Sequence, residues 1–318
     1  MTVAIGLVFS LGLFFLSSSA QDEAANKSQT KSPYLIVLGI AQDGGVPQAG
    51  TKEHKGWRDD DFHRHVVCLA IVDPTTSERW MIDCTPDFPR QLHILDEVAP
   101  AEGRPGLSGM FLTHAHIGHY TGLVHLGHEV MGASDVPVHA MPRMFEYLST
   151  NGPWDQLVRY KNIELYRLSD GSPVELNPRL SIEPFLVPHR QEYSEVVGYR
   201  ITGPNRSVIY IPDIDSWEEW DEMGTRIENV VAESDVCYLD GTFYADGEIP
   251  GRDMSGFPHP MIAHTMERLG SLPPADRAKV RFLHLNHTNP ALRPESDARK
   301  TIEKNGFAVA EELERVEL

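Results

Sequence analysis

From residue 33 onward, short apolar runs alternate with groups of glycine, proline and aspartate. Short apolar runs bounded by turn-forming residues are typical of buried strands, whereas apolar positions three and four residues apart indicate amphipathic helices. This pattern predicts strands at residues 34–38, 66–72, 79–82, 110–113, 136–140, 180–187, 196–202, 207–212, 236–239 and 280–285. It predicts helices at residues 88–98, 122–131, 143–148, 216–231, 260–269 and 295–305.

The predicted strands occur in clusters of two or three, with helices between the clusters. A doubly wound parallel sheet would instead show strict alternation of strand and helix. We therefore expect an α/β (α+β) fold in which two mixed β-sheets stack face to face and helices cover their outer surfaces.

The first 32 residues differ in pattern from the rest of the chain. Residues 2–20 carry no charge, and their apolar part, residues 3–16, is short for a membrane span. Small residues at 17–20 suit cleavage by a signal peptidase before Gln21. We therefore predict a signal peptide at residues 1–20, a flexible polar leader at 21–32 and one domain at 33–318. The basic segment that usually begins a signal peptide is missing, which leaves an uncleaved anchor or a misassigned start codon as alternatives.

On this interpretation the mature protein is exported, periplasmic or secreted, and keeps no stable membrane span. The net charge of −18 argues against nucleic acid or an anionic membrane surface as the main partner. We expect a small-molecule substrate instead. The three cysteines, Cys68, Cys84 and Cys237, show neither CxxC spacing nor a disulfide framework, so they do not indicate a redox compartment.

A histidine or aspartate lies at or just after the end of six of the predicted apolar strands. Loops at one edge of stacked sheets are where functional side chains gather. One histidine at such a position is more often a structural hydrogen-bonding residue, but six histidines and aspartates favour a shared site. The six residues are Asp83, His114, His189, Asp213, Asp240 and His284.

The stretch THAHIGHYTGL, residues 113–123, places three imidazoles close together. His114 and His116 are separated by one residue, so in an extended segment both rings point to the same side and can hold one metal ion. His119 follows a turn at Gly118 and can reach a neighbouring position.

His189 and Asp213, which come much later in the chain, can complete a cage of nitrogen and oxygen ligands. Such ligands suit zinc, and also iron or manganese. Neutral imidazole and carboxylate ligands allow a metal to convert bound water to hydroxide near neutral pH. The pattern therefore predicts a catalytic metal.

Residues 113–123, followed in order by His189, Asp213 and His284, resemble the signature of the metallo-β-lactamase superfamily, in which a strand delivers a His-x-His-x-Asp-His run. The resemblance covers most of residues 33–318 and implies a four-layer αββα sandwich with a metal site at one edge. The segments LGIAQDGGVPQAG, IDCTPDFPRQL, YLDGTFYADGEI and HLNHTNP are similar to the pyrroloquinoline quinone biosynthesis protein B branch of this superfamily.

The resemblance implies two neighbouring metal positions bridged by Asp213. The first position takes three imidazoles, those of His114, His116 and His189. The second is faced by two, those of His119 and His284. Asp83 is expected to orient one of the ligand imidazoles. Three further residues are expected beside the ligands or facing the substrate, namely Asp240, His259 and His287.

Gly118 stands where the superfamily places its aspartate, so the second metal position lacks a carboxylate. We therefore expect one firmly held metal and a weak or altered second site, because three protein ligands and a water suffice for an open catalytic site. The other possibility is a substitute ligand, for which the candidates are Asp240, His259, His264 and His287. The Asp43–Gly45 loop is either a lining of the site or a simple Asp-Gly-Gly turn.

These features together predict a metal-dependent hydrolase with one or two zinc ions, or with iron or manganese. A hydroxide generated on the metal would attack an ester, phosphodiester or related bond, with Asp213 and His119 as the catalytic residues. Two alternatives are an iron-dependent oxygenase of the quinone-cofactor type and a non-catalytic relative that binds metal or a small ligand. The predicted export favours the hydrolase, because cofactor synthesis on a cytoplasmic peptide fits poorly with a secreted chain.

Overall fold

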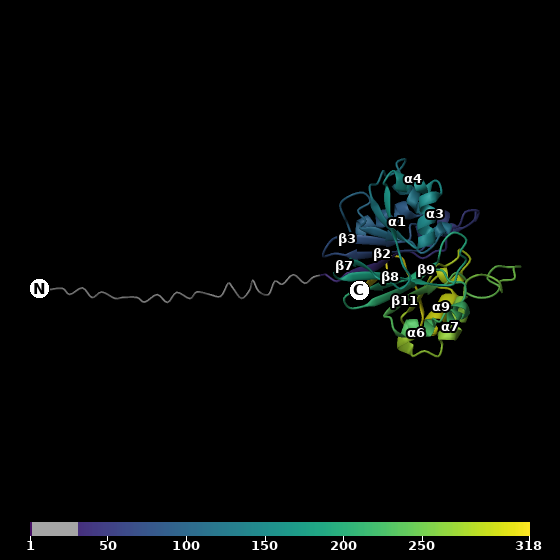
Figure 1. Ribbon diagram of the computed structural model, residues 1–318. Helices are drawn as coiled ribbons and strands as arrows, with labels where there is room; N and C mark the ends of the chain where they lie inside the picture. Colours follow the sequence, from purple (N-terminus) through teal and green to yellow (C-terminus); the bar gives the residue numbers. More distant parts are fainter. Residues whose placement is uncertain (2–30) are drawn as a thin grey trace. The chain divides into compact units, whose positions relative to one another are not determined.

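Two seven-stranded β-sheets form the centre of the computed structural model, which describes residue 1 and residues 31–318 (Figure 1). Residues Ser32–Leu318 form one compact unit. The two mixed sheets confirm the predicted fold class. The predicted signal peptide and almost all of the predicted leader lie outside the described residues.

The first sheet has the strand order β14-β1-β2-β3-β4-β5-β6. Its strands are antiparallel from β14 to β3 and parallel from β3 to β6. The strands are β1 (Tyr34–Gly39), β2 (Cys68–Asp73), β3 (Glu78–Ile82), β4 (Gly109–Phe111), β5 (Val136–Ala140), β6 (Ile163–Arg167) and β14 (Arg315–Glu317).

The second sheet has the strand order β13-β12-β11-β10-β9-β8-β7. It is parallel from β13 to β10 and antiparallel from β10 to β7. The strands are β7 (Val174–Asn177), β8 (Leu180–Leu186), β9 (Val197–Thr202), β10 (Ser207–Ile211), β11 (Val236–Asp240), β12 (Val280–Leu283) and β13 (Ala308–Val309).

Successive residues of β1 enter two different hydrophobic clusters, which explains the layered arrangement. Leu35 and Val37 join the cluster that contains the residues of the second sheet, whereas Ile36 and Leu38 join the cluster formed with the helices on the outer face. Side chains alternate between the two faces of a strand, so a strand that is apolar throughout must be covered on both faces. The apolar runs of the sequence therefore require a layer on each side of the first sheet.

Helices cover the outer faces of both sheets, with α1, α3 and α4 on one side and α6, α7 and α9 on the other (Figure 1). The α-helices are α1 (Phe88–Val98), α2 (Ile117–Tyr120), α3 (Pro142–Thr150), α4 (Trp154–Arg159), α5 (Trp217–Glu222), α6 (Ile227–Ala232), α7 (Ile262–Leu269), α8 (Pro274–Arg277) and α9 (Asp297–Lys304). Short 3-10 helices are η1 (Lys55–Trp57), η2 (Asp60–Phe62), η3 (Thr121–Leu126) and η4 (Pro290–Leu292).

Some predicted elements differ from the structure. The single helix expected at 216–231 is two helices, α5 and α6, because Gly224 between them has a φ of 91°, outside the helical range. The side chain of Ser216 caps α5, accepting hydrogen bonds from the backbone N–H groups of Glu218 and Glu219. The helix expected at 122–131 is the shorter 3-10 helix η3. The strands β6, β7, β13 and β14 were not predicted.

The strands that precede the predicted site residues run in one direction within each sheet. β3 and β4 are parallel in the first sheet, and β10, β11 and β12 are parallel in the second. β8 runs the same way as β10, because both are antiparallel to β9. The carboxyl ends of these strands therefore place the residues that follow them at one edge of each sheet.

Two of these strand-end residues adopt a left-handed backbone, with φ of 69° at Asp83 and 60° at His284. Residues other than glycine rarely hold this conformation, and those that do are concentrated at functional sites. Both residues belong to the cluster described below.

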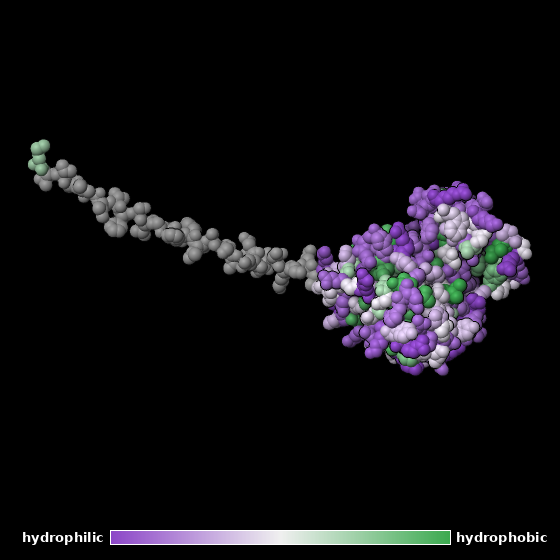
Figure 2. Space-filling model, turned by 90° about the horizontal axis from the view of Figure 1, so that it is seen from above, coloured by the Kyte–Doolittle hydropathy of each residue, from purple (hydrophilic) through white to green (hydrophobic). Residues whose placement is uncertain are grey.

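Among the described residues, no helix is long and apolar enough to cross a membrane. Hydrophilic residues cover most of the face shown in Figure 2, and apolar residues appear there as small separate patches.

Candidate metal centre

Asp213, which follows β10, lies at the middle of a buried cluster of histidines. Its Oδ2 atom is 2.9 Å from His119 Nε2, 3.2 Å from His284 Nε2 and 3.5 Å from His114 Nε2. Its Oδ1 atom is 3.7 Å from His189 Nε2. Residues from both sheets thus meet at one carboxylate, as the strand-end pattern predicted.

His114, His116 and His189 form one group of possible metal ligands. One nitrogen from each ring lies within 4.8 Å of the others. His189 Nε2 and His116 Nδ1 are only 3.1 Å apart. This group contains the three imidazoles that the resemblance implies for the first metal position.

A second group consists of His119, His284 and a residue that was not predicted as a ligand, Asp43. Asp43 Oδ1 lies 3.3 Å from His119 Nε2 and 3.7 Å from His284 Nε2. Although burial alone would raise the pKa of Asp43, its contacts with the two imidazoles hold it well below the ordinary value. Asp43 is therefore a carboxylate facing the second group, not only part of a turn.

Four polar atoms of these two groups are buried without a hydrogen-bond partner. They are Asp43 Oδ1 and the Nε2 atoms of His114, His119 and His284. Buried polar atoms are nearly always satisfied, so such a concentration of unsatisfied atoms calls for a physical reason. Imidazole nitrogens and carboxylate oxygens pointing at a common space are the donor set that a zinc ion, or an iron or manganese ion, would satisfy. The residues present therefore fit a bound metal.

The other ring nitrogen of each ligand histidine has a polar partner. Three rings face carboxylates, with distances of 2.8 Å for His119 Nδ1 to Asp83, 2.6 Å for His189 Nδ1 to Asp215 and 3.0 Å for His116 Nε2 to Glu192. Two face hydroxyls, with distances of 3.0 Å for His114 Nδ1 to Thr113 and 2.8 Å for His284 Nδ1 to Thr242. Such partners fix the tautomer and direction of metal-binding histidines.

Asp83 thus lies where the predicted orienting carboxylate is needed. Its position is itself fixed, because it accepts hydrogen bonds from both the backbone N–H and the hydroxyl of Thr113. Asp215 and Glu192 were not predicted, although Asp215 lies two residues after Asp213 and Glu192 three residues after His189. That proximity is the only sequence signal that could have identified them.

Asp240 and His259 form a pair beside the cluster. Asp240 Oδ2 is 2.7 Å from His259 Nδ1, and the same ring atom is 3.5 Å from Asp213 Oδ1. Burial would lower the pKa of His259, but the charge and hydrogen bond of Asp240, together with the charges of Asp213 and Asp43, outweigh burial and raise the pKa to about 9. Asp213, Asp240, His259 and His284 also offer ligand atoms within 4.8 Å of one another. The pair can therefore either position a proton or contribute a ligand.

Two of the candidate substitute ligands, His264 and His287, lie outside the cluster, and Cys84 beside Asp83 offers no reactive thiol. His264 is exposed on α7, 3.3 Å from Glu218, so the expectation that it could replace the missing ligand is wrong. His287 hydrogen-bonds to Asn286 and lines a neighbouring cavity, so it too is not among the grouped ligands. Cys84 is fully buried, and burial raises the pKa of its thiol well above the ordinary value. A thiol in that environment is inert.

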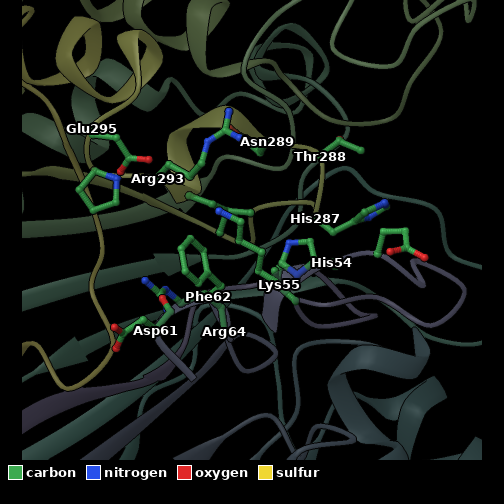
Figure 3. Close-up of a pocket in the computed structure, with 14 residues that line it drawn as sticks. His54, Lys55, Asp61, Phe62, Arg64, His287, Thr288, Asn289, Arg293 and Glu295 are labelled. Atoms are coloured by element: carbon green, nitrogen blue, oxygen red, sulfur yellow. The ribbon is translucent and has the colours of Figure 1, made fainter. Parts of the chain in front are cut away.

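The cavity near His287 has a volume of about 520 Å³ and lies between residues 46–64 and 287–295 (Figure 3). Its lining includes three basic residues, Lys55, Arg64 and Arg293, and three acidic residues, Glu53, Asp61 and Glu295. In its wall, Val46 is three residues after Asp43, and His287 is three residues after His284. Three residues span at most ~11 Å, so the cavity is next to the cluster.

Comparisons with known proteins agree with this architecture. A beta-lactamase superfamily domain model matches residues 78–310. The coenzyme PQQ synthesis protein B of Methylobacterium sp. (strain 4-46) is 26% identical over 304 residues, which cover 86% of this chain and 96% of that protein.

Solved structures share the fold. The Zn²⁺-bound PqqB from Methylobacterium extorquens superposes with a TM-score of 0.73 at 22% identity, covering 90% of this chain and 100% of the other. A diphosphatase from the PhnP family has a TM-score of 0.65 at 20% identity, covering 91% and 98%. With its two stacked sheets, its edge cluster of histidines and aspartates and the match over residues 78–310, the chain belongs to the beta-lactamase superfamily, as a metallo-β-lactamase-fold protein similar to coenzyme PQQ synthesis protein B.

Proposed function

We propose that the protein is a metal-dependent hydrolase acting on an ester, phosphodiester or related bond of a small molecule. The observation that carries the proposal is the set of four buried, unsatisfied ligand atoms, Asp43 Oδ1 and the Nε2 atoms of His114, His119 and His284, around the carboxylate of Asp213. The fold shared with a diphosphatase supports hydrolysis, and the fold shared with a Zn²⁺-bound relative supports zinc.

In this proposal the first metal position is held by imidazoles of His114, His116 and His189. His119 and His284 face the second position, and Asp213 lies between the two. A bound zinc ion would supply Lewis acidity, both to lower the pKa of a water molecule and to polarise the substrate.

The protein's own residues then have separate tasks. The Asp213 carboxylate lies between the imidazole groups, where it can accept a hydrogen bond from the attacking water and orient it. Asp240 engages Nδ1 of His259, which leaves Nε2 as the ring atom able to donate a proton to the leaving group. This assigns the proton transfer to His259, whereas His119, which the sequence analysis predicted to be catalytic, contacts Asp83 on one side and Asp213 on the other. We therefore give His119 the role of a ligand.

The neighbouring cavity supports a polar substrate. Its volume of about 520 Å³ suits a small molecule, and its lining carries both basic and acidic side chains. We propose that the bond to be hydrolysed sits at the cluster while the rest of the substrate extends toward Arg293 and His287.

Hydrolysis of bis(p-nitrophenyl) phosphate and of p-nitrophenyl acetate by zinc-loaded protein tests this function. We expect turnover of at least one of them, and its loss in His116→Ala. The matched control is His264→Ala, which changes an exposed histidine outside the cluster and should keep full activity. Turnover that persists unchanged in His116→Ala would contradict the proposal.

The similarity to coenzyme PQQ synthesis protein B supports a second candidate, an iron-dependent oxygenase reaction in quinone-cofactor synthesis. The same nitrogen and oxygen ligands suit iron. Metal analysis of protein purified without added metal separates the candidates, because zinc favours hydrolysis and iron favours the oxygenase. Substrate-dependent oxygen consumption by iron-loaded protein would favour the second candidate.

We also propose that the chain is exported, on the strength of the uncharged residues 2–20 alone. Export would favour the hydrolase. Cell fractionation with an antibody against residues 33–318 tests it, and recovery of the protein only in the cytoplasm would contradict it.

A further inference from the structure

Gly118, the residue that interrupts the metal-binding motif, lies directly against Asp43. A Cβ atom built on Gly118 would lie 2.1 Å from Asp43 Oδ1 and 2.6 Å from Asp43 Cα. Cβ contacts shorter than 3.0 Å are essentially never observed, and the backbone atom of Asp43 cannot rotate away. The space that a side chain at position 118 would occupy is therefore filled by the carboxylate of Asp43.

The carboxylate delivered to this space is suitably placed for a metal. Asp43, His119 and His284 each offer a ligand atom within 4.8 Å of the others. Asp43 Oδ1 and the Nε2 atoms of both histidines are buried and lack hydrogen-bond partners. Asp213 Oδ2 lies 2.9 Å from His119 Nε2 and 3.2 Å from His284 Nε2, so a second carboxylate faces the same space without making a hydrogen bond to either ring atom.

The loop that carries Asp43 is fastened to the segment that carries His284. The backbone N–H of Gln42 donates to Leu285 O at 2.9 Å, and the N–H of Leu285 donates to Ile40 O at 2.8 Å. Gly45, with a φ of 67°, then turns the chain so that its N–H donates to Gln42 O at 2.7 Å. These backbone hydrogen bonds hold the residues before Asp43 against Leu285, which follows His284.

We propose that Asp43 is a ligand of the second metal position and replaces the aspartate that the motif lacks at position 118. Asp43 can occupy this space only because residue 118 has no side chain, and it returns to the site the carboxylate that the motif lacks there. The second position keeps two imidazoles and two carboxylates, those of Asp43 and Asp213, so the protein binds two ions. This inference deepens the proposed function, but it concerns metal binding and does not depend on which reaction occurs.

The test measures bound metal rather than activity. Wild-type protein and Asp43→Ala are loaded with zinc, dialysed against a zinc buffer and analysed by atomic emission. We expect two ions per chain in the wild type and one in Asp43→Ala. Loss of a residue that only hydrogen-bonds to a metal ligand weakens metal binding roughly 10- to 100-fold. Loss of the ligand Asp43 should weaken binding of the second ion by at least that factor. The matched control is Asp246→Ala, an exposed aspartate outside the cluster, which should keep two ions.

A reciprocal exchange separates ligation from general damage to the fold. Gly118→Asp alone should bind the second ion poorly and unfold at a lower temperature, because its side chain collides with Asp43. The double variant Asp43→Gly with Gly118→Asp should regain two ions, because the carboxylate returns to the same space from the other segment.

Two ions retained by Asp43→Ala at wild-type affinity would overturn the inference, as would a wild type that binds a single ion at saturating zinc. Failure of the double variant to regain the second ion while remaining folded would also contradict it. None of these results bears on whether an ester or phosphodiester is hydrolysed, so the two proposals fail separately.

Discussion

His259 and Asp240 form a buried pair in which the imidazole Nδ1 lies 2.7 Å from the carboxylate Oδ2. Asp240 also accepts hydrogen bonds from the backbone N–H groups of Ile214 and Thr242, which fix the carboxylate and thereby the ring. The arrangement holds the imidazole beside Asp213 without using Nε2.

The first prediction follows from this pair. His259→Gln should lower kcat by about 10²- to 10⁴-fold, the usual contribution of a positioned general acid, while bound zinc stays constant. Asp240→Asn should have a smaller effect in the same direction, because the ring remains but its orientation is lost. Steady-state kinetics with metal analysis of the same samples measures both.

The matched control is His264→Gln on the exposed face of α7, which should behave as the wild type. Loss of zinc together with activity in His259→Gln would show that His259 is instead a ligand, as the proximity of its ring to Asp213 and His284 also allows.

The second prediction concerns Asp83. Asp83→Asn should weaken zinc binding roughly 10- to 100-fold, because His119 loses the carboxylate that orients its ring. The variant should still fold, since asparagine tolerates the left-handed backbone of this position and can accept the hydrogen bond from the Thr113 N–H. Competition with a chromophoric chelator measures the affinity. Asp246→Asn is the control, and equal affinities in the two variants would contradict the role given to Asp83.

Site residues could be predicted where the evidence for them lies in the neighbouring sequence, and could not be predicted where it depends on a contact between distant segments. His114, Asp213 and His284 were found because each closely follows an apolar strand, and parallel strands bring their carboxyl ends to one edge. Asp43 was not identified as a ligand, because its role depends on contact with Gly118, far along the chain. The sequence indicated an Asp-Gly-Gly turn at Asp43 and a missing carboxylate at Gly118, but only the fold shows that these two residues are in contact.

The same distinction applies to the fold. The strands of the sheet centres were predicted well, because they are buried on both faces and apolar throughout. β6 and β7 were missed because their residues are largely exposed or half-buried, so their sequences lack that signal. The break between α5 and α6 depends on the positive φ of Gly224, which a helical spacing of apolar residues does not reveal.

The third prediction is that removal of the metal destabilises the protein. Without an ion, the buried Nε2 atoms and Asp43 Oδ1 stay unsatisfied, and the native state loses the binding free energy. Ligand present at 100 times its Kd stabilises the native state by about 2.7 kcal/mol, so chelation should remove at least that amount. Calorimetric Tm values with EDTA, and with EDTA plus excess zinc, measure the effect. A Tm unaffected by EDTA in protein shown to have lost its zinc would contradict the prediction.

His139 on β5 gives a fourth prediction, independent of the metal. Its ring lies between two aromatic rings, with centroids 4.4 Å from Phe111 and 5.1 Å from Tyr166. Burial there lowers the pKa of His139 to about 4. An unfolded chain takes up this proton near pH 6.5, whereas the native protein does not until about pH 4. The free energy of unfolding should therefore fall as the pH is lowered from about 6.5 to about 4, and His139 contributes no such loss above that window.

His139→Phe removes this titration and keeps the stacking. When the pH is lowered from 7.5 to 5, the free energy of unfolding of the variant should rise by about 1 to 2 kcal/mol relative to that of the wild type. This value is smaller than the full 1.4 kcal/mol per pKa unit because the ring is partly exposed. Urea unfolding of both metal-free proteins at both pH values measures these free energies. The ligand histidines protonate alike in the two proteins, so their contribution cancels in the difference between variant and wild type. The control is His93→Gln, an exposed histidine of α1, for which the difference should stay constant. A variant-minus-wild-type difference for His139→Phe that does not change with pH would show that the ring titrates in the native state as it does in the unfolded chain.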